Sequence, residues 1–371
     1  MKVLICAGGT GGGIYPALTA AEKLQENGVA TADLLWVGVR GEMEETLVPR
    51  AGIRLEKIVG GAIAGVSRWQ QLKNGIKLLW SVWLSFRLMG RFRPDVVFLT
   101  GGYMAVPVGV AARIRRIPAV MYLPDLEPGS ALKTISRFVD TVTATFEASK
   151  RYFPAGKRLI ETGYPIRPAL VEASELPKTD ALEAFDLAAD KPVLFVFGGS
   201  RGAKSINDAL MAFLPQILDQ IQVIHVSGTL TWPEVETFSE TLPDHLKTNY
   251  RPFPYLHEEM GLAFRAADLV VARAGASMMG ECPLFAAPAI LVPYPYAWRY
   301  QKINADFLVE RGAGVRLDDE RLKTDLAQTI QRLMLTEPER LEEMKKAAQS
   351  LHRPGAAERL AEVIMEVGRF K

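Results

Sequence analysis

The sequence has few of the residues that form disulfides or bind metal ions in small secreted domains: two cysteines and four histidines in 371 residues. Cys6 lies in an apolar run typical of a buried strand, and Cys282 lies near the start of an expected helix in the other half of the chain. We therefore expect neither a disulfide framework nor a cysteine-based metal site, and a reducing compartment is the natural location. The apolar run after Met1 is too short for a signal peptide, and no stretch approaches the roughly 18 apolar residues of a membrane-spanning helix.

Acidic residues are missing from one long stretch, because no Asp or Glu occurs between Glu56 and Asp95. Residues 1–165 carry 21 Lys and Arg against 13 Asp and Glu, whereas residues 166–371 carry 23 against 29. Within residues 67–94, tryptophans and leucines recur near helical spacing among basic residues, which is typical of a helix on a membrane surface. A core helix packed on a sheet has the same periodicity and stays open as an alternative. The residues expected at the membrane are Trp69, Lys73, Lys77, Trp80, Trp83 and Arg87.

Glycine is concentrated in two loops, each between a strand-like apolar run and a helical pattern. Residues 8–13 are Gly-Gly-Thr-Gly-Gly-Gly, and residues 198–202 are Gly-Gly-Ser-Arg-Gly. Glycine lets backbone N–H groups approach an anion, and the helix that follows directs its positive dipole end to the same place. One such loop is also compatible with a mere tight turn. Two of them, about 190 residues apart, predict two Rossmann-like halves that face one phosphate-bearing ligand.

Strand-like runs alternate with amphipathic helical patterns along the chain, which predicts an α/β protein with two doubly wound parallel sheets. Several runs are apolar throughout, as expected for parallel strands buried on both faces. We expect a first domain over residues 1–165 and a second over 166–352, linked by residues 163–168 and the charged segment 172–191. The expected strands are 3–7, 34–39, 96–100, 119–123, 141–144, 192–197, 221–227, 269–272 and 289–292.

The order and spacing of these pieces resemble the MurG family of inverting glycosyltransferases over nearly the whole chain. The resemblance implies the two-domain GT-B fold, with residues 353–371 packed back on the first domain. It also implies a UDP-GlcNAc donor site in the second domain and an undecaprenyl-diphosphate-linked acceptor that the first domain reaches from the cytoplasmic face of an anionic membrane. The motifs that carry it are residues 8–18, 94–103, 163–167, 198–207, 255–260, 273–281, 288 and 301–304.

The resemblance and the chemistry of the residue types together define the expected donor site. Glu281 opens a helix after a Gly-Ala-Ser turn, where a carboxylate can accept both ribose hydroxyls. Arg167, with Ser200 and Arg201, would neutralise the donor diphosphate. The sequence has no Asp-x-Asp motif, so we expect backbone dipoles and cations, without a metal ion or other cofactor, to stabilise the leaving UDP. The expected donor residues are Arg167, Ser200, Arg201, Gly202, Leu256, His257, Met260, Glu281, Gln301 and Asn304.

The acceptor side departs from the family pattern. Gly13 stands where the family usually has histidine, and residues 122–125 replace its His-Glu-Gln-Asn stretch. Inverting transfer needs a general base, and Asp125, at the carboxyl end of the strand 119–123, is expected to supply it, with Glu127 as the second candidate. A loop aspartate that caps the next helix is the alternative. The residues expected at the acceptor diphosphate are Thr10, Gly11, Gly12, Gly13 and Tyr103.

The resemblance therefore implies an enzyme that moves GlcNAc from UDP-GlcNAc to lipid I, giving lipid II, and the basic, Trp-rich segment predicts that it binds a membrane peripherally. We expect no nucleic-acid partner. The altered acceptor side leaves open a related GT-B enzyme acting on diacylglycerol or another polyprenyl acceptor, or a nucleotide-sugar-binding protein that has lost catalysis. A UDP-GlcNAc 2-epimerase is disfavoured because the basic, Trp-rich segment has no purpose there. A NAD dehydrogenase is disfavoured because the second expected strand is followed by Arg40 rather than an acidic residue.

Overall fold

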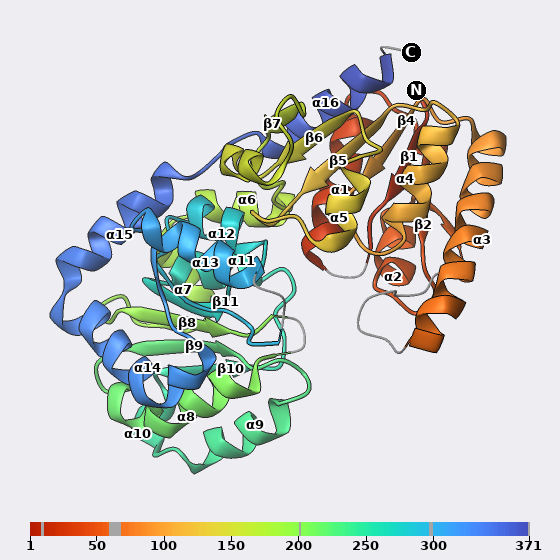
Figure 1. Ribbon diagram of the computed structural model, residues 1–371. Coiled ribbons are helices and arrows are strands. Elements are labelled where there is room, and N and C mark those ends of the chain that lie inside the picture. The colour runs from red at the N-terminus through yellow and green to blue at the C-terminus, as the bar shows by residue number, and fades with distance from the viewer. Residues whose placement is uncertain (9–10, 59–67, 200–201, 297–299, 370–371) are drawn as a thin grey trace. The chain divides into compact units, whose positions relative to one another are not determined.

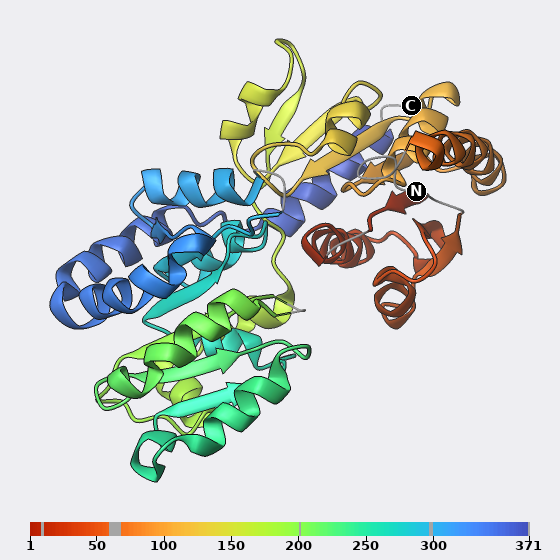
Figure 2. The same cartoon turned by 60° about the horizontal axis from the view of Figure 1, so that its bottom comes forward.

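The computed structural model describes the chain except residues 9–10, 59–67, 200–201, 297–299 and 370–371, and except the side chains of residues 68–76. The chain forms two compact units, which are shown in Figures 1 and 2. The first unit comprises Met1–Arg167 and Arg353–Lys371, and the second comprises Pro168–His352. No helix in the described part of the chain is long and apolar enough to cross a membrane.

A parallel sheet of seven strands forms the centre of the first unit, in the order β3-β2-β1-β4-β5-β6-β7. Its residues alternate between two hydrophobic clusters, so that Val3 and Ile5 face one layer of helices while Leu4 and Cys6 face the other. Apolar side chains on both faces explain why the central strands of this sheet, such as β1 and β4, are continuous apolar runs in the sequence. The strands are β1 (Val3–Cys6), β2 (Leu34–Gly38), β3 (Arg54–Lys57), β4 (Val96–Leu99), β5 (Ala119–Leu123), β6 (Thr141–Ala144) and β7 (Leu159–Glu161).

Helices cover both faces of this sheet. On one face, α16 (Ala356–Arg369), from the far end of the sequence, packs against α1 (Gly11–Glu26), and Glu358 pairs with Lys23 at 3.1 Å. The short helix α2 (Glu44–Arg50) adds Val48 to the same cluster. The other face is covered by α3 (Arg68–Phe92), α4 (Ala105–Ile114) and α5 (Ser130–Ile135). The first unit is thus a three-layer α/β sandwich made from both ends of the chain.

The second unit contains a parallel sheet of six strands in the order β10-β9-β8-β11-β12-β13. The cluster on one face takes its side chains from the sheet, α8, α14 and α15. On the other face Phe264 of α11 contacts the rings of Phe195, Phe197 and Phe285. The strands are β8 (Val193–Phe197), β9 (Gln222–Val226), β10 (Tyr250–Phe253), β11 (Leu269–Arg273), β12 (Ala289–Val292) and β13 (Gly314–Arg316). The helices are α6 (Pro168–Glu175), α7 (Lys178–Ala184), α8 (Lys204–Ile217), α9 (Trp232–Thr241), α10 (Asp244–Lys247), α11 (Met260–Ala266), α12 (Met278–Leu284), α13 (Tyr300–Glu310), α14 (Leu322–Gln331) and α15 (Pro338–Ser350).

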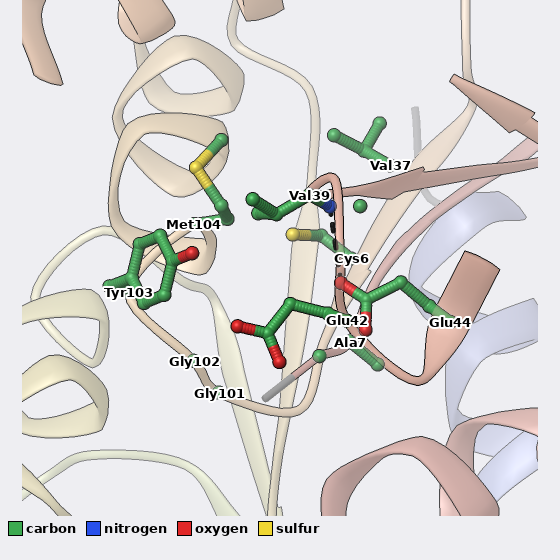
Figure 3. Close-up of a pocket in the computed structure, with 12 residues that line it drawn as sticks. Cys6, Ala7, Val37, Val39, Glu42, Glu44, Gly101, Gly102, Tyr103 and Met104 are labelled. Carbon is green, nitrogen blue, oxygen red and sulfur yellow. Dashed lines mark hydrogen bonds between the residues drawn. The ribbon is translucent and has the colours of Figure 1, made fainter. Parts of the chain in front are cut away.

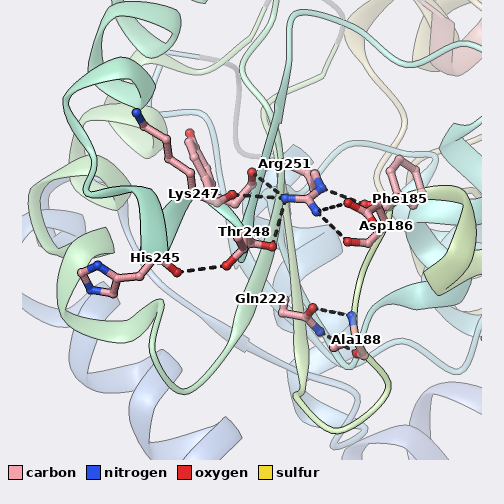
Figure 4. A network of polar contacts seen from close by, with 9 residues as sticks. Phe185, Asp186, Ala188, Gln222, His245, Lys247, Thr248 and Arg251 are labelled. Carbon is pink, nitrogen blue, oxygen red and sulfur yellow. Dashed lines mark hydrogen bonds and ion pairs between the residues drawn. The ribbon is translucent and has the colours of Figure 1, made fainter.

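The charged segment 172–191 is not a link, which corrects the expectation from the sequence. It belongs to α6, α7 and the loop after them, and both helices pack on α11. Figure 4 shows how that loop is held: Arg251 of β10 donates hydrogen bonds to the carbonyls of Phe185 and Asp186 at 2.8 and 2.6 Å. Gln222 of β9 bonds both the N–H and the carbonyl of Ala188. Short helices bury few residues and expose many charges, so this segment looks like a linker in the sequence.

Candidate functional site

Each sheet reverses its strand order around the strand that precedes a glycine loop. In the first unit β1 lies between β2 and β4, and in the second unit β8 lies between β9 and β11. The loops after these strands leave the carboxyl edge of the sheet in opposite directions, and ligands of open α/β sheets bind in the crevice between such loops. Both predicted glycine loops therefore lie at a binding position of their own sheet.

In the first unit, the loop after β1 and the loop after β4 are in contact. Thr100 donates a hydrogen bond from Oγ1 to the carbonyl of Gly13 at 2.9 Å. A Cβ on Gly13 would lie 3.1 Å from that hydroxyl oxygen, and one on Gly102 would lie 3.0 Å from the carbonyl oxygen of Gly8. Gly11, Gly12 and Gly13 form the first turn of α1, while Thr10 lies outside the described residues. The structure thus brings the described glycines and the loop that bears Tyr103 to one crevice.

A small acidic cavity, shown in Figure 3, lies beside these loops. It has a volume of about 10 Å³, and its lining includes Cys6, Glu42, Glu44 and Tyr103. Burial raises the pKa of the Cys6 thiol, and burial followed by the charges of Glu42 and Glu44 raises the pKa of Tyr103. Sequence reasoning missed the two glutamates, although an acidic cluster directly after a predicted central strand was the available signal.

The two candidate bases follow β5, the neighbour of β4 in the sheet. Asp125 is partly exposed, whereas Glu127 is buried and pairs with the half-exposed Lys133 at 3.2 Å. The N-cap position of α5 is occupied by Gly129 in an extended conformation, not by Asp125. The assignment of Asp125 as the helix cap is therefore wrong, and the role of general base remains a prediction for both carboxylates.

In the second unit, Gly202 of the glycine loop packs closely against the end of β9. Gly202 has a φ of +80°, and a Cβ there would lie 2.1 Å from the carbonyl oxygen of Ser227. Only glycine fits this backbone, since the position demands both a left-handed conformation and the absence of a side chain. Ser200 and Arg201, which the sequence places in the same loop, lie outside the described residues.

A buried polar network fixes the helix that follows this loop. Asn207 of α8 donates through Nδ2 to the carbonyl of Ser227 at 2.9 Å and to Thr231 Oγ1 at 2.8 Å. Its Oδ1 therefore accepts from His225 Nε2 at 2.9 Å, which leaves His225 Nδ1 to accept the hydroxyl proton of Tyr250 at 2.7 Å. Burial lowers the pKa of His225 to about 3. The imidazole is neutral and has a structural role, which the sequence analysis did not predict.

Two charged residues lie at the end of β11 and in the helix that follows it. Glu281, buried in α12, accepts a hydrogen bond from Ser277 Oγ through Oε2 at 2.9 Å. Arg273, the last residue of β11, bonds Asp319 at 2.5 Å and Ser205 Oγ at 2.8 Å. Ser205 lies in the first turn of α8, so Arg273 ties β11 to the helix that the glycine loop begins.

The two amide residues expected at the donor site, Gln301 and Asn304, form hydrogen bonds to neighbouring loops. Gln301 accepts the N–H of Tyr294 through Oε1 at 2.8 Å. Asn304 is buried and donates to the carbonyl of Ala274 at 3.3 Å. These bonds connect α13 to the loops after β12 and β11, at the same edge of the sheet as Glu281.

The other expected donor residues lie apart from this cluster in sequence. Leu256 is buried after β10, and the exposed His257 donates its backbone N–H to Glu259 Oε2 at 3.2 Å. Met260 is the first residue of α11. Arg167 belongs to the first unit, where its guanidinium lies 4.7 Å from the ring centroid of Tyr15 in α1.

Helix α3 exposes the two tryptophans whose side chains the structure describes. Trp80 and Trp83 are 52% and 42% exposed, and their rings stack with centroids 4.5 Å apart. Arg87 lies 4.9 Å from the ring centroid of Trp83, and Lys77 is exposed. The side chains of Trp69 and Lys73 lie outside the described residues. The buried stripe of the same helix is Ser81, Ser85, Leu88 and Met89. The core explanation is therefore wrong for the two described tryptophans.

Comparison with known proteins agrees with this geometry. The N-terminal domain of glycosyltransferase family 28 matches residues 3–144, and its C-terminal domain matches residues 193–360. A protein of Desulforamulus reducens named UDP-N-acetylglucosamine--N-acetylmuramyl-(pentapeptide) pyrophosphoryl-undecaprenol N-acetylglucosamine transferase is 38% identical, over 96% of each chain. The crystal structure of Acinetobacter baumannii MurG superimposes with a TM-score of 0.76 at 28% identity, covering 98% of this chain and 99% of that one.

The crystal structure of a UDP-GlcNAc 2-epimerase from Neisseria meningitidis, bound to UDP-GlcNAc, superimposes with a TM-score of 0.66 at 16% identity, covering 99% of this chain and 100% of that one. At this identity the similarity shows the fold alone. Two doubly wound parallel units, each with a glycine loop at the reversal of its strand order, form the GT-B fold, and the two family 28 domains identify the chain as a glycosyltransferase. The chain belongs to glycosyltransferase family 28 and, within it, to the MurG family.

Proposed function

We propose that this protein transfers GlcNAc from UDP-GlcNAc to undecaprenyl-diphosphate-linked N-acetylmuramyl-pentapeptide, converting lipid I to lipid II. The observation that carries the proposal is the full-length similarity to enzymes named for this reaction, which spans both units of the fold. The epimerase likeness does not compete with it, because it rests on fold alone.

The donor site is proposed at the crevice between β8 and β11. The donor diphosphate would bind at the glycine loop and the N-terminus of α8, whose N–H groups and dipole favour an anion. Glu281 would accept the ribose hydroxyls, and Arg273 would hold α8 in place from β11. The arrangement supports binding of a nucleoside diphosphate without a bound metal ion.

The proposed chemistry is a single displacement with inversion. The acceptor hydroxyl oxygen forms a bond to the anomeric carbon of GlcNAc while the bond from that carbon to UDP breaks, and UDP leaves with the bonding electrons. Asp125 takes the hydroxyl proton. Glu127, which pairs with Lys133, is the second candidate. The positive end of the α8 dipole would stabilise the charge that develops on UDP.

Peripheral binding to the cytoplasmic face of the membrane is proposed for α3. The stacked Trp80 and Trp83 would enter the interface, and Lys77 and Arg87 would meet anionic headgroups. Two exposed tryptophans flanked by basic residues support this proposal. The acceptor lipid would then reach the first unit from the same membrane.

An acceptor screen with radiolabelled UDP-GlcNAc tests the function. Incubation with a lipid I analogue should give a labelled lipid product, whereas diacylglycerol and a no-acceptor control should give none. Labelled diacylglycerol would favour the related lipid glycosyltransferase. UDP binding without product from any acceptor would favour a binding protein that has lost catalysis, and epimerised nucleotide sugar in the no-acceptor control would favour an epimerase.

A further inference from the structure

The acidic cavity of the first unit is formed by segments that follow three adjacent strands. Gly8 follows β1, Glu42 and Glu44 follow β2, and Tyr103 follows β4. These strands are neighbours in the order β2-β1-β4, so the cavity lies where parallel sheets bind ligands. Its volume of about 10 Å³ accommodates roughly one group the size of a water molecule or a hydroxyl.

One carboxylate oxygen in this cavity lacks a donor. Glu44 is 1% exposed, and its Oε1 accepts the backbone N–H of Val39 at 3.1 Å. Its Oε2 has no hydrogen-bond partner among the residues that the structure describes. A buried polar atom that stays unpaired is destabilising. Among the described residues, this oxygen can therefore accept a hydrogen bond from a bound group.

Two neighbouring glycines leave room for this carboxylate. A Cβ on Gly8 would lie 2.8 Å from Glu44 Oε1, and a Cβ on Gly38 would lie 2.7 Å from Glu44 Cγ. Both glycines thus leave the space that the Glu44 side chain fills. The carboxylate packs directly against the loop that leads into the first turn of α1, where the acceptor diphosphate is expected.

The charge of the cavity selects the kind of group that can enter. Figure 3 shows the Glu42 carboxylate between Tyr103 and Glu44, and the described lining contains no Lys or Arg. Two carboxylates repel a phosphate but form strong, short bonds with a hydroxyl donor. The cavity is therefore unsuited to the diphosphate and suited to a sugar hydroxyl.

We propose that Glu44 accepts, through Oε2, a hydrogen bond from a hydroxyl group of the acceptor sugar. The cavity is then a hydroxyl subsite, next to the diphosphate subsite at the start of α1 and distinct from it. This inference rests on the proposed function, since it takes the acceptor to be a sugar.

The test is Glu44→Gln, which keeps an oxygen for the Val39 N–H and replaces only Oε2 with an amide NH₂. The kcat/KM for a lipid I analogue should fall about tenfold or more, because the amide NH₂ in place of Oε2 cannot accept the hydroxyl proton and the charge-assisted bond is lost. The Kd for UDP, measured by calorimetry, should not change. Glu45→Gln is the matched control: Glu45 lies on the same helix, outside the cavity, and pairs with Lys57 at 2.7 Å. It should keep the parental kinetics.

Deoxy analogues of the acceptor identify the hydroxyl. One analogue should lose activity with the parent enzyme but show no additional loss with Glu44→Gln, because the missing hydroxyl is the partner of the missing carboxylate oxygen. Unchanged kcat/KM for Glu44→Gln, with the parent active, would overturn the subsite alone. Losses that simply add for every analogue would do the same. A parent without turnover of the lipid I analogue would overturn the proposed function and the subsite together.

Discussion

Lowering the pH from 7 to 5 should destabilise the second unit through the buried His225. A histidine in the unfolded chain has a pKa of about 6.5, whereas burial lowers the pKa of native His225 to about 3. Between these values the unfolded state binds a proton that the native state does not. The free energy of unfolding therefore falls as the pH falls, by about 1.4 kcal/mol per pH unit. The contribution should be about 2 kcal/mol at pH 5 and should disappear above about pH 7.

The assay follows each unit separately, because a two-unit chain need not unfold in one step. Urea titrations at pH 7 and 5 with pulsed hydrogen exchange and mass spectrometry would monitor peptides that cover β9, with β4 of the first unit as an internal reference. A loss of about 2 kcal/mol corresponds to a decrease of about 1 M in the urea midpoint of β9. The decrease should be smaller in a His225→Gln variant, whose side chain does not titrate.

A matched variant, His245→Gln on the exposed helix α10, controls for removal of a histidine from the same unit and should keep the parental difference between pH 7 and pH 5. His225→Gln also leaves the buried Tyr250 hydroxyl without its acceptor, so its stability at pH 7 should itself be lower. Only the difference between the two pH values tests the reasoning. An equal decrease in the parent and in His225→Gln would refute it.

Three further predictions concern the proposed function. Glu281→Ala should weaken UDP binding by about 2 to 4 kcal/mol, since it leaves buried polar partners unpaired; calorimetry that finds parental affinity would remove Glu281 from the donor site. Replacing Trp80 and Trp83 with serine should abolish co-sedimentation with anionic vesicles while UDP affinity is kept, and unchanged sedimentation would contradict the membrane role of α3. Asp125→Asn should lower kcat by roughly 10² to 10⁴ with normal UDP binding; if only Glu127→Gln does so, Glu127 is the base.

The strands show what sequence periodicity can and cannot reveal. Every strand expected from an apolar run is present, with ends that shift by at most one residue. The strands that were not predicted are β3, β7, β10 and β13, and each lies at an edge of its sheet. An edge strand is paired on one side only and needs no continuous apolar run: β3 is Arg-Leu-Glu-Lys. In β10, Pro252 occupies a position that an interior strand would not tolerate.

The site was predictable where the chemistry is local and unpredictable where it depends on tertiary contacts. Glycine loops between a strand and a helix are visible in the sequence, and the topology places both at a binding crevice. The bond from Arg273 to Ser205 joins residues 68 positions apart, and the approach of Glu44 to Gly8 depends on the pairing of β1 with β2. Neither follows from periodicity, because each requires knowledge of which segments lie side by side.

Helix α3 illustrates a more specific limit of pattern reading, because periodicity alone could not separate a core face from a membrane face. Periodicity assigns the more apolar stripe of a helix to the core, yet the stripe that α3 buries includes Ser81 and Ser85. Their hydroxyls donate to the carbonyls of Lys77 and Ser81, both at 2.7 Å, so no polar group is lost on burial. With Ser81 and Ser85 buried beside Leu88 and Met89, Trp80 and Trp83 remain exposed to water. That arrangement supports the membrane role proposed for α3, since one face packs on the sheet and the other presents Trp80 and Trp83.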